Sequence, residues 1–264
     1  MKTNRREFPR NIWLLVLGAV AWLTASTALA TPCIAPDNGG GTATLPPAGC
    51  NYQGDMMQII DGLPAGATID MAGPTLGGFF SISDVPGGSL GGNLQDYGAI
   101  LMLQMNGTGA LAGFNRLINV NLPDGVSTNQ MASAPRTPGT SPQSFNTEVF
   151  RLIGQITGDP DFDLLRITGG TDFALPSPGH TTLTSVPGGG NWNVDSFFDI
   201  TFRIDFIGAP GGSLEGRSGS TTGTAHFVLG EQARPIPEPS ALALQGMGSI
   251  LMWVLAWRRR LGLA

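Results

Sequence analysis

Three aspartates at alternate positions are the group of residues in this chain best suited to bind a cation. Asp159, Asp161 and Asp163 form a D-x-D-x-D stretch, and carboxylate oxygens at this spacing are ligands that calcium uses. An EF-hand loop would continue with glycine at its sixth position and glutamate at its twelfth, where this chain has Leu164 and Gly170. The pattern leaves two alternatives, a calcium site of another type or an acidic turn, and no other cofactor is expected.

A tryptophan between two asparagines suggests a contact with sugar. Trp192 follows a glycine-rich segment and is flanked by Asn191 and Asn193. An exposed indole ring can stack on a sugar ring while neighbouring amides bind its hydroxyls. The alternatives are a glycan contact at Trp192 or a tryptophan that packs over the edge of a sheet.

The sequence contains two histidines, His180 and His226, and no motif of the common catalytic classes. It has no H-E-x-x-H, C-x-x-C, P-loop or G-x-S-x-G sequence. Serines and aspartates are present, but no spacing groups them with either histidine. A non-enzymatic protein is the favoured interpretation, with a secreted hydrolase as the less favoured alternative.

The elements that hold these residues are expected to be short strands. Glycine accounts for 39 of 264 residues and proline for 20, while 12% of residues are charged and 41% are hydrophobic. Frequent glycine and proline interrupt helices, and the apolar content is too high for a disordered chain. The composition predicts an all-β domain, an antiparallel β-sandwich or jelly roll with Gly/Pro-rich turns.

Apolar residues at every second position locate the strands. In 199–206 the apolar side chains alternate with polar ones, which predicts a half-buried strand. The segment 99–105 is apolar on both faces and predicts a central strand, and 130–146, with three prolines, predicts a long loop. Turns are expected at three Pro-Gly-Gly sequences that begin at Pro86, Pro187 and Pro210. Weaker strand predictions are 56–60, 68–71, 79–83, 117–122, 148–156, 163–168, 181–186 and 224–229.

Charge and cysteine use indicate the compartment and exclude one class of partner. Between residues 31 and 236 there is no lysine, and acidic residues outnumber arginines. Such a domain repels phosphate backbones, so nucleic acid is not an expected partner. Cys33 and Cys50 are the two cysteines; they form one disulfide in an oxidising compartment or remain two free thiols.

The N-terminus has the layout of a secretion signal. Residues 1–10 are basic, 12–25 are almost wholly apolar, and Ala28-Leu29-Ala30 is a small-residue cleavage sequence. The pattern predicts a signal peptide over 1–30 that is removed after Ala30. The paired arginines Arg5 and Arg6 leave the twin-arginine export route as an alternative to general secretion.

The C-terminus combines three features in a fixed order. Pro237-Glu238-Pro239 precedes an apolar segment over 241–257, and Arg258, Arg259 and Arg260 follow. The apolar segment is just long enough for a transmembrane helix, and its basic end is expected to stay in the cytoplasm. The predicted domains are therefore the signal peptide over 1–30, an exported all-β domain over 31–234 and a tail over 235–264.

This tail resembles the PEP-CTERM sorting signal of bacteria that make exopolysaccharide. The resemblance implies that an exosortase in the membrane recognises Pro237, Glu238 and Pro239, cleaves near them and passes the protein to the outer surface. Segments 158–163 and 194–200 also resemble stretches of exported bacterial proteins, which implies no activity. The expected protein is anchored in the inner membrane before processing and is then at the cell surface or extracellular, associated with exopolysaccharide. The alternative is a glycan- or calcium-binding surface module.

Overall fold

The computed structural model describes residues 32–125 and 128–230, so the expected signal peptide and sorting tail lie outside the described residues. The prediction of an all-β, antiparallel domain is confirmed: the described residues form thirteen strands and two short 3-10 helices, η1 (Gly109–Leu111) and η2 (Thr171–Phe173). The strands are β1 (Cys33–Pro36), β2 (Tyr52–Gly54), β3 (Met56–Ile59), β4 (Ile69–Ala72), β5 (Thr75–Pro86), β6 (Asn93–Gly107), β7 (Asn115–Leu122), β8 (Gln130–Ser133), β9 (Gln143–Thr157), β10 (Phe162–Gly169), β11 (Pro178–Ser185), β12 (Asn191–Gly208) and β13 (Ser218–Leu229).

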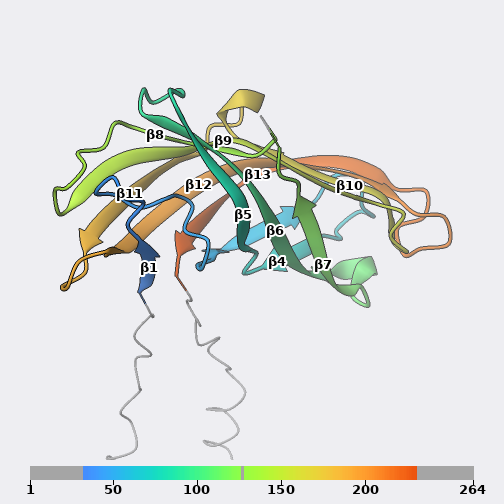
Figure 1. Ribbon diagram of the computed structural model, residues 1–264. Helices are drawn as coiled ribbons and strands as arrows, with labels where there is room; N and C mark the ends of the chain where they lie inside the picture. Colours follow the sequence, from blue (N-terminus) through green and yellow to red (C-terminus); the bar gives the residue numbers. More distant parts are fainter. Residues whose placement is uncertain (1–31, 126–127, 231–264) are drawn as a thin grey trace, which may run out of the picture.

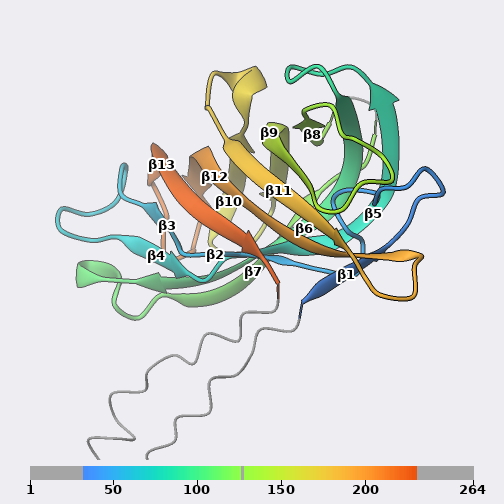
Figure 2. The same ribbon diagram turned by 90° about the vertical axis from the view of Figure 1, so that its left-hand side faces the viewer.

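All thirteen strands belong to one sheet that curls back on itself (Figures 1 and 2). Starting at β6, the pairings pass through β8, β9, β11, β12, β13, β2 and β5 and return to β6. The long strands β9 and β12 flank β11 along one half of their length and β10 along the other. The sheet therefore encloses its own core, and few strand edges are left open.

The three predicted Pro-Gly-Gly turns all connect antiparallel neighbours. The turn after Pro86 joins β5 to β6, the turn after Pro187 joins β11 to β12, and the turn after Pro210 joins β12 to β13. In the first of them Gly87 has φ 119° and Gly88 has φ 92°. Residues with a Cβ rarely adopt these angles, so glycine is what allows the chain to reverse here.

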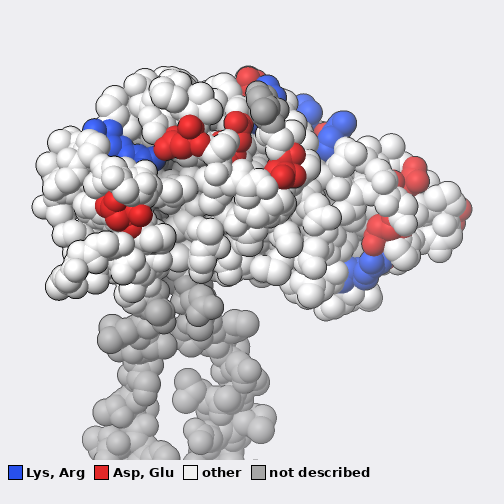
Figure 3. Space-filling model, viewed as in Figure 1, with Lys and Arg blue, Asp and Glu red and all other residues white. Residues whose placement is uncertain are grey.

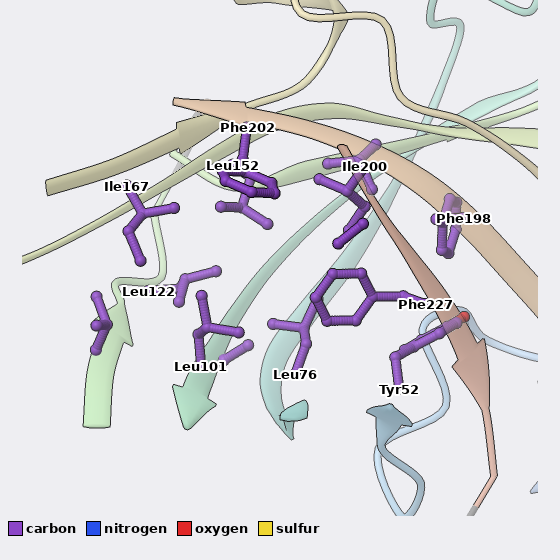
Figure 4. Packing of buried hydrophobic residues seen from close by; sticks show 14 of the residues in the cluster. Tyr52, Leu76, Leu101, Leu122, Leu152, Ile167, Phe198, Ile200, Phe202 and Phe227 are labelled. Carbon is purple, nitrogen blue, oxygen red and sulfur yellow. The ribbon is translucent and has the colours of Figure 1, made fainter. Parts of the chain in front are cut away.

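The core lies between the two halves of the curled sheet. As the alternation in 199–206 predicts, Ile200, Phe202, Ile204 and Phe206 of β12 are buried. Figure 4 shows side chains of this strand meeting those of β5, β6 and β7 from the opposite half. Burial of apolar side chains from both halves supplies the main stabilisation, at roughly 25 cal/mol per Å² of apolar surface.

One local prediction is confirmed and one is wrong. The segment 99–105 is a central strand, paired on both edges as part of β6; one of its faces is buried, and Ile100 and Met102 lie exposed on the other. The predicted loop 130–146 contains β8 and the start of β9, because β8 pairs with β6 and β9 while the start of β9 pairs with β11. The weaker strand predictions are confirmed, each of them overlapping an observed strand.

Candidate functional site

The acidic turn between β9 and β10 binds an arginine. The Arg116 guanidinium donates to Asp159 Oδ2 at 2.8 Å and also to Asp161 Oδ2. Arg116 belongs to β7, more than forty residues earlier in the chain, and the backbone N–H of Ser213 donates to Asp161 Oδ1 at 2.9 Å. Three segments that are distant in sequence therefore meet at Asp161.

The electrostatics of this cluster favour the ionised carboxylate. Burial raises the pKa of Asp161. The hydrogen bonds from Ser213, together with the hydrogen bond and charge of Arg116, lower it by more than burial raises it, so the pKa lies below its ordinary value. Asp159 contributes a second carboxylate, and its Oδ1 accepts the backbone N–H of Asp161 at 2.9 Å. The cluster is thus a structural ion pair that joins the β9–β10 turn to β7.

The calcium hypothesis requires carboxylate oxygens that the cluster has already committed to hydrogen bonds. Asp159 and Asp161 both point at the guanidinium, while Asp163 is exposed on β10. Within residues 32–125 and 128–230, no group of three His, Cys, Asp or Glu side chains is arranged to hold a metal ion. The D-x-D-x-D spacing indicates oxygen ligands for a cation, but it does not reveal that the cation is the Arg116 guanidinium.

Trp192 does not present the open ring that sugar stacking requires. It lies at the start of β12 with 5% of its surface exposed, and its indole N–H donates to Asp37 Oδ2 at 2.8 Å. This hydrogen bond, opposed by burial and aided by the backbone N–H groups of Gly39 and Gly41, lowers the pKa of Asp37. Of the two alternatives left by the sequence, the structure has a packed tryptophan: Trp192 lies in the core cluster and anchors the loop after β1.

The two histidines lie in polar pairs on exposed positions of the sheet. His180 Nε2 is 2.8 Å from Ser144 Oγ, and His180 Nδ1 is 3.2 Å from Asn146 Oδ1. His226 Nδ1 is 2.6 Å from Asp199 Oδ1. The histidines and their partners sit opposite or diagonal to one another on neighbouring strands.

The Ser144–His180–Asn146 arrangement has the order of a nucleophile, a base and an orienting group. Acyl transfer also needs hydrogen-bond donors aimed at the developing oxyanion. Here β9 and β11 are neighbours in an antiparallel ladder, which uses backbone N–H groups for pairing. The three residues therefore form a cross-strand hydrogen-bonded row, and the geometry offers no support for hydrolysis.

Cys33 and Cys50 are joined in a disulfide, with their Cα atoms 5.9 Å apart. Of the two alternatives left by the sequence, the structure has the disulfide. It ties the first described strand, β1, to the segment that leads into β2. Cys33 itself is buried in the core cluster.

Both ends of the described domain meet beside this disulfide. A hollow of about 300 Å³ is lined by Pro32, Cys33, Ile34, Gly49, Cys50, Asn51 and Gly230. Gly230 donates its N–H to the carbonyl of Asn51 at 3.0 Å. In Figure 1, β1 begins and β13 ends on the same side of the molecule. We call this end of the molecule, defined by the residues lining the hollow, the disulfide pole.

Comparison of the chain with models of protein families, with curated proteins and with solved structures gives no match. Among the helices of residues 32–125 and 128–230, none is long and apolar enough to cross a membrane. The predicted membrane segment 241–257, the sorting residues Pro237 to Pro239 and the signal cleavage residues Ala28 and Ala30 lie outside the described residues. Arg258, Arg259 and Arg260 lie outside them as well.

Proposed function

We propose that this chain is an exported, non-enzymatic surface or matrix protein, sorted by an exosortase and associated with exopolysaccharide. The observation that carries the proposal is the C-terminal order of Pro237-Glu238-Pro239, an apolar segment over 241–257 and the arginines 258–260. This order resembles the PEP-CTERM signal, and the N-terminal pattern with Ala28 and Ala30 resembles a cleavable secretion signal. General secretion is the proposed route, and twin-arginine export remains the alternative.

The architecture of the domain is suited to this routing. The two ends of the domain meet at the disulfide pole, so the domain can fold as one unit between the two terminal signals. Six residues lie between Gly230 and Pro237, so the seven Cα–Cα steps that join them span at most about 25 Å in an extended chain. The sorting motif would therefore lie close to the disulfide pole while the tail is in the membrane.

The disulfide supports the proposal of export, because disulfides form in oxidising compartments outside the cytoplasm. Cys33 and Cys50 are bonded, and structural disulfides persist mainly in exported proteins. We also propose that the two halves of the curled sheet act as the two layers of the expected sandwich or jelly roll. A curled all-β sheet of this kind is a scaffold for surface contacts.

The sorting proposal is tested by changing the motif and leaving the domain intact. Pro237→Ala combined with Pro239→Ala should hold the protein in the inner-membrane fraction of a host that has an exosortase. A matched control, Pro235→Ala, lies just outside the motif and should leave the protein on the cell surface or in the medium. If the double variant is released as efficiently as the control, the exosortase proposal is wrong.

A further inference from the structure

The outer face of β6 and β7 carries a regular pattern of apolar and amide side chains. Three cross-strand pairs lie on it, and each contains one apolar residue and one amide residue. Leu117 is 66% exposed, Met102 37% and Ile100 36%. We call this surface the β6–β7 face; its pairs are Ile100 with Asn121, Met102 with Asn119, and Gln104 with Leu117.

Strand geometry makes this face continuous. Residues at every second position of one strand point the same way, and directly paired residues on neighbouring strands stand about 5 Å apart. Three consecutive pairs therefore form a strip about 13 Å long between the first and last residues of each strand. Phe80, which is 45% exposed, extends the apolar surface at the Ile100 end by covering Gly98, its partner on β6.

Two asparagines of the strip, Asn119 in its middle and Asn121 at its Ile100 end, are free to bind. The side chains of Asn119 and Asn121 make no hydrogen bond to another residue among 32–125 and 128–230. In contrast, Asn115 at the end of β7 donates to Asn106 at 2.8 Å and accepts from Gln104 at 3.2 Å. The strip thus offers amide donors and acceptors directly beside exposed apolar side chains.

Charge selects the class of partner. Residues 32–230 contain six arginines and sixteen acidic residues, a net charge of −10 with histidine neutral, yet none of the six side chains of the β6–β7 face is ionisable. In Figure 3 the surface around the position of β7 in Figure 1 is mostly white, with charged side chains above it and to both sides. An acidic domain repels anionic polymers and anionic lipid surfaces, so an uncharged face on it is complementary to an uncharged partner.

We propose that the β6–β7 face binds a neutral polysaccharide. The apolar side chains would contact the C–H faces of sugar rings, and Asn119 and Asn121 would hydrogen-bond the hydroxyls. This proposal rests on the exopolysaccharide association proposed above and specifies both the surface and the class of polymer. It also moves the glycan contact from the buried Trp192 to an exposed face of the sheet.

The test compares the full-length chain with variants of this face by affinity electrophoresis in native detergent gels. The gels contain dextran, galactomannan or xyloglucan as neutral probes, or alginate as an anionic one. The wild-type chain should be retarded by at least one neutral polymer and not by alginate. Met102→Asp and Asn121→Asp should each weaken that retardation about tenfold or more, because the first removes an apolar contact and the second removes the amide N–H donors. Ile207→Asp, at an exposed apolar position on β12, is the matched control and should bind as wild type.

Other outcomes overturn this proposal in distinguishable ways. Neutral-polymer binding that survives both face variants would place the glycan site elsewhere and leave the matrix proposal standing. Retardation by alginate alone, or by none of the four polymers, would refute the choice of a neutral polymer. A dimer in sedimentation that Met102→Asp converts to a monomer would show that the occupant is a second copy of this chain. Failure of the native matrix to retain the wild-type chain would refute the proposed function itself.

Discussion

Replacement of Arg116 by methionine tests most directly whether the ion pair joins the β9–β10 turn to β7. Methionine keeps an unbranched apolar stem and removes the guanidinium, so Asp159 and Asp161 lose the cation that bridges them. The Arg116 side chain is 30% exposed and the two aspartates 17% and 12%. An ion pair of this burial falls between surface pairs, worth up to about 1 kcal/mol, and buried ones, whose disruption costs about 3–5 kcal/mol.

We therefore expect Arg116→Met to lower the free energy of unfolding by about 2 kcal/mol. For a domain of this size the melting temperature should fall by about 4–8 °C. Urea and thermal unfolding of the full-length chain, followed by circular dichroism, measure both quantities. The matched control is Arg203→Met, because Arg203 is 46% exposed in its contact with Asp205 and should lose less than about 1 kcal/mol. Equal losses in the two variants would refute the bridging role of Arg116.

The pH dependence of the same pair has a defined sign. The pKa of Asp161 is lower in the folded protein than its ordinary value. Its stabilising contribution is therefore complete above the ordinary aspartate pKa and is lost as the pH falls through the lower, folded value. Unfolding curves of the wild-type chain should show a loss of stability in this acidic range that Arg116→Met reduces. A wild-type acid limb that is unchanged by Arg116→Met would contradict this linkage.

Three further predictions concern the core and its two anchors. Substitution of both Cys33 and Cys50 by serine should cost about 3 kcal/mol, as expected for a loop of this length, and reductant should destabilise only the wild-type chain in urea titrations. Trp192→Phe removes the hydrogen bond to Asp37 and should lower the free energy of unfolding without reducing retention by native matrix; lost retention would restore Trp192 as a glycan contact. Phe202→Ala should cost about 3–5 kcal/mol by leaving a cavity between the sheet halves, and a loss below 1 kcal/mol would mean that the core is not packed as described.

The fold was predictable where the sequence pattern is local. In β12 the alternation of Ile200, Phe202 and Ile204 with polar residues reflects one covered face, so the strand and its orientation follow from period 2 alone. In β6 the sequence located the central strand, but a strand that is apolar on both faces does not reveal that Ile100 and Met102 face outward. Strand β8 was missed because its four residues are all buried in a polar, proline-rich context that gives no alternation.

The candidate site was less predictable from the sequence than the fold. The acidic turn was located from the sequence, but its role as an ion pair depends on Arg116. This residue belongs to β7, which is distant in sequence and is brought near the turn only by the fold. One signal was available: Arg116 is one of only six cations between residues 32 and 230, and partly buried carboxylates in such a domain need one of them. Trp192 gave no comparable signal, because an indole between asparagines reads the same whether its ring is exposed or buried.

The measurement that most directly tests the central proposal is the intact mass of the protein from its native host, combined with cell fractionation. Export and sorting predict a chain that begins at Thr31, ends near Pro237 and is found at the cell surface or in the medium. A chain that retains Arg258 to Ala264 in the inner membrane at steady state would show a permanently anchored protein and contradict processing by an exosortase.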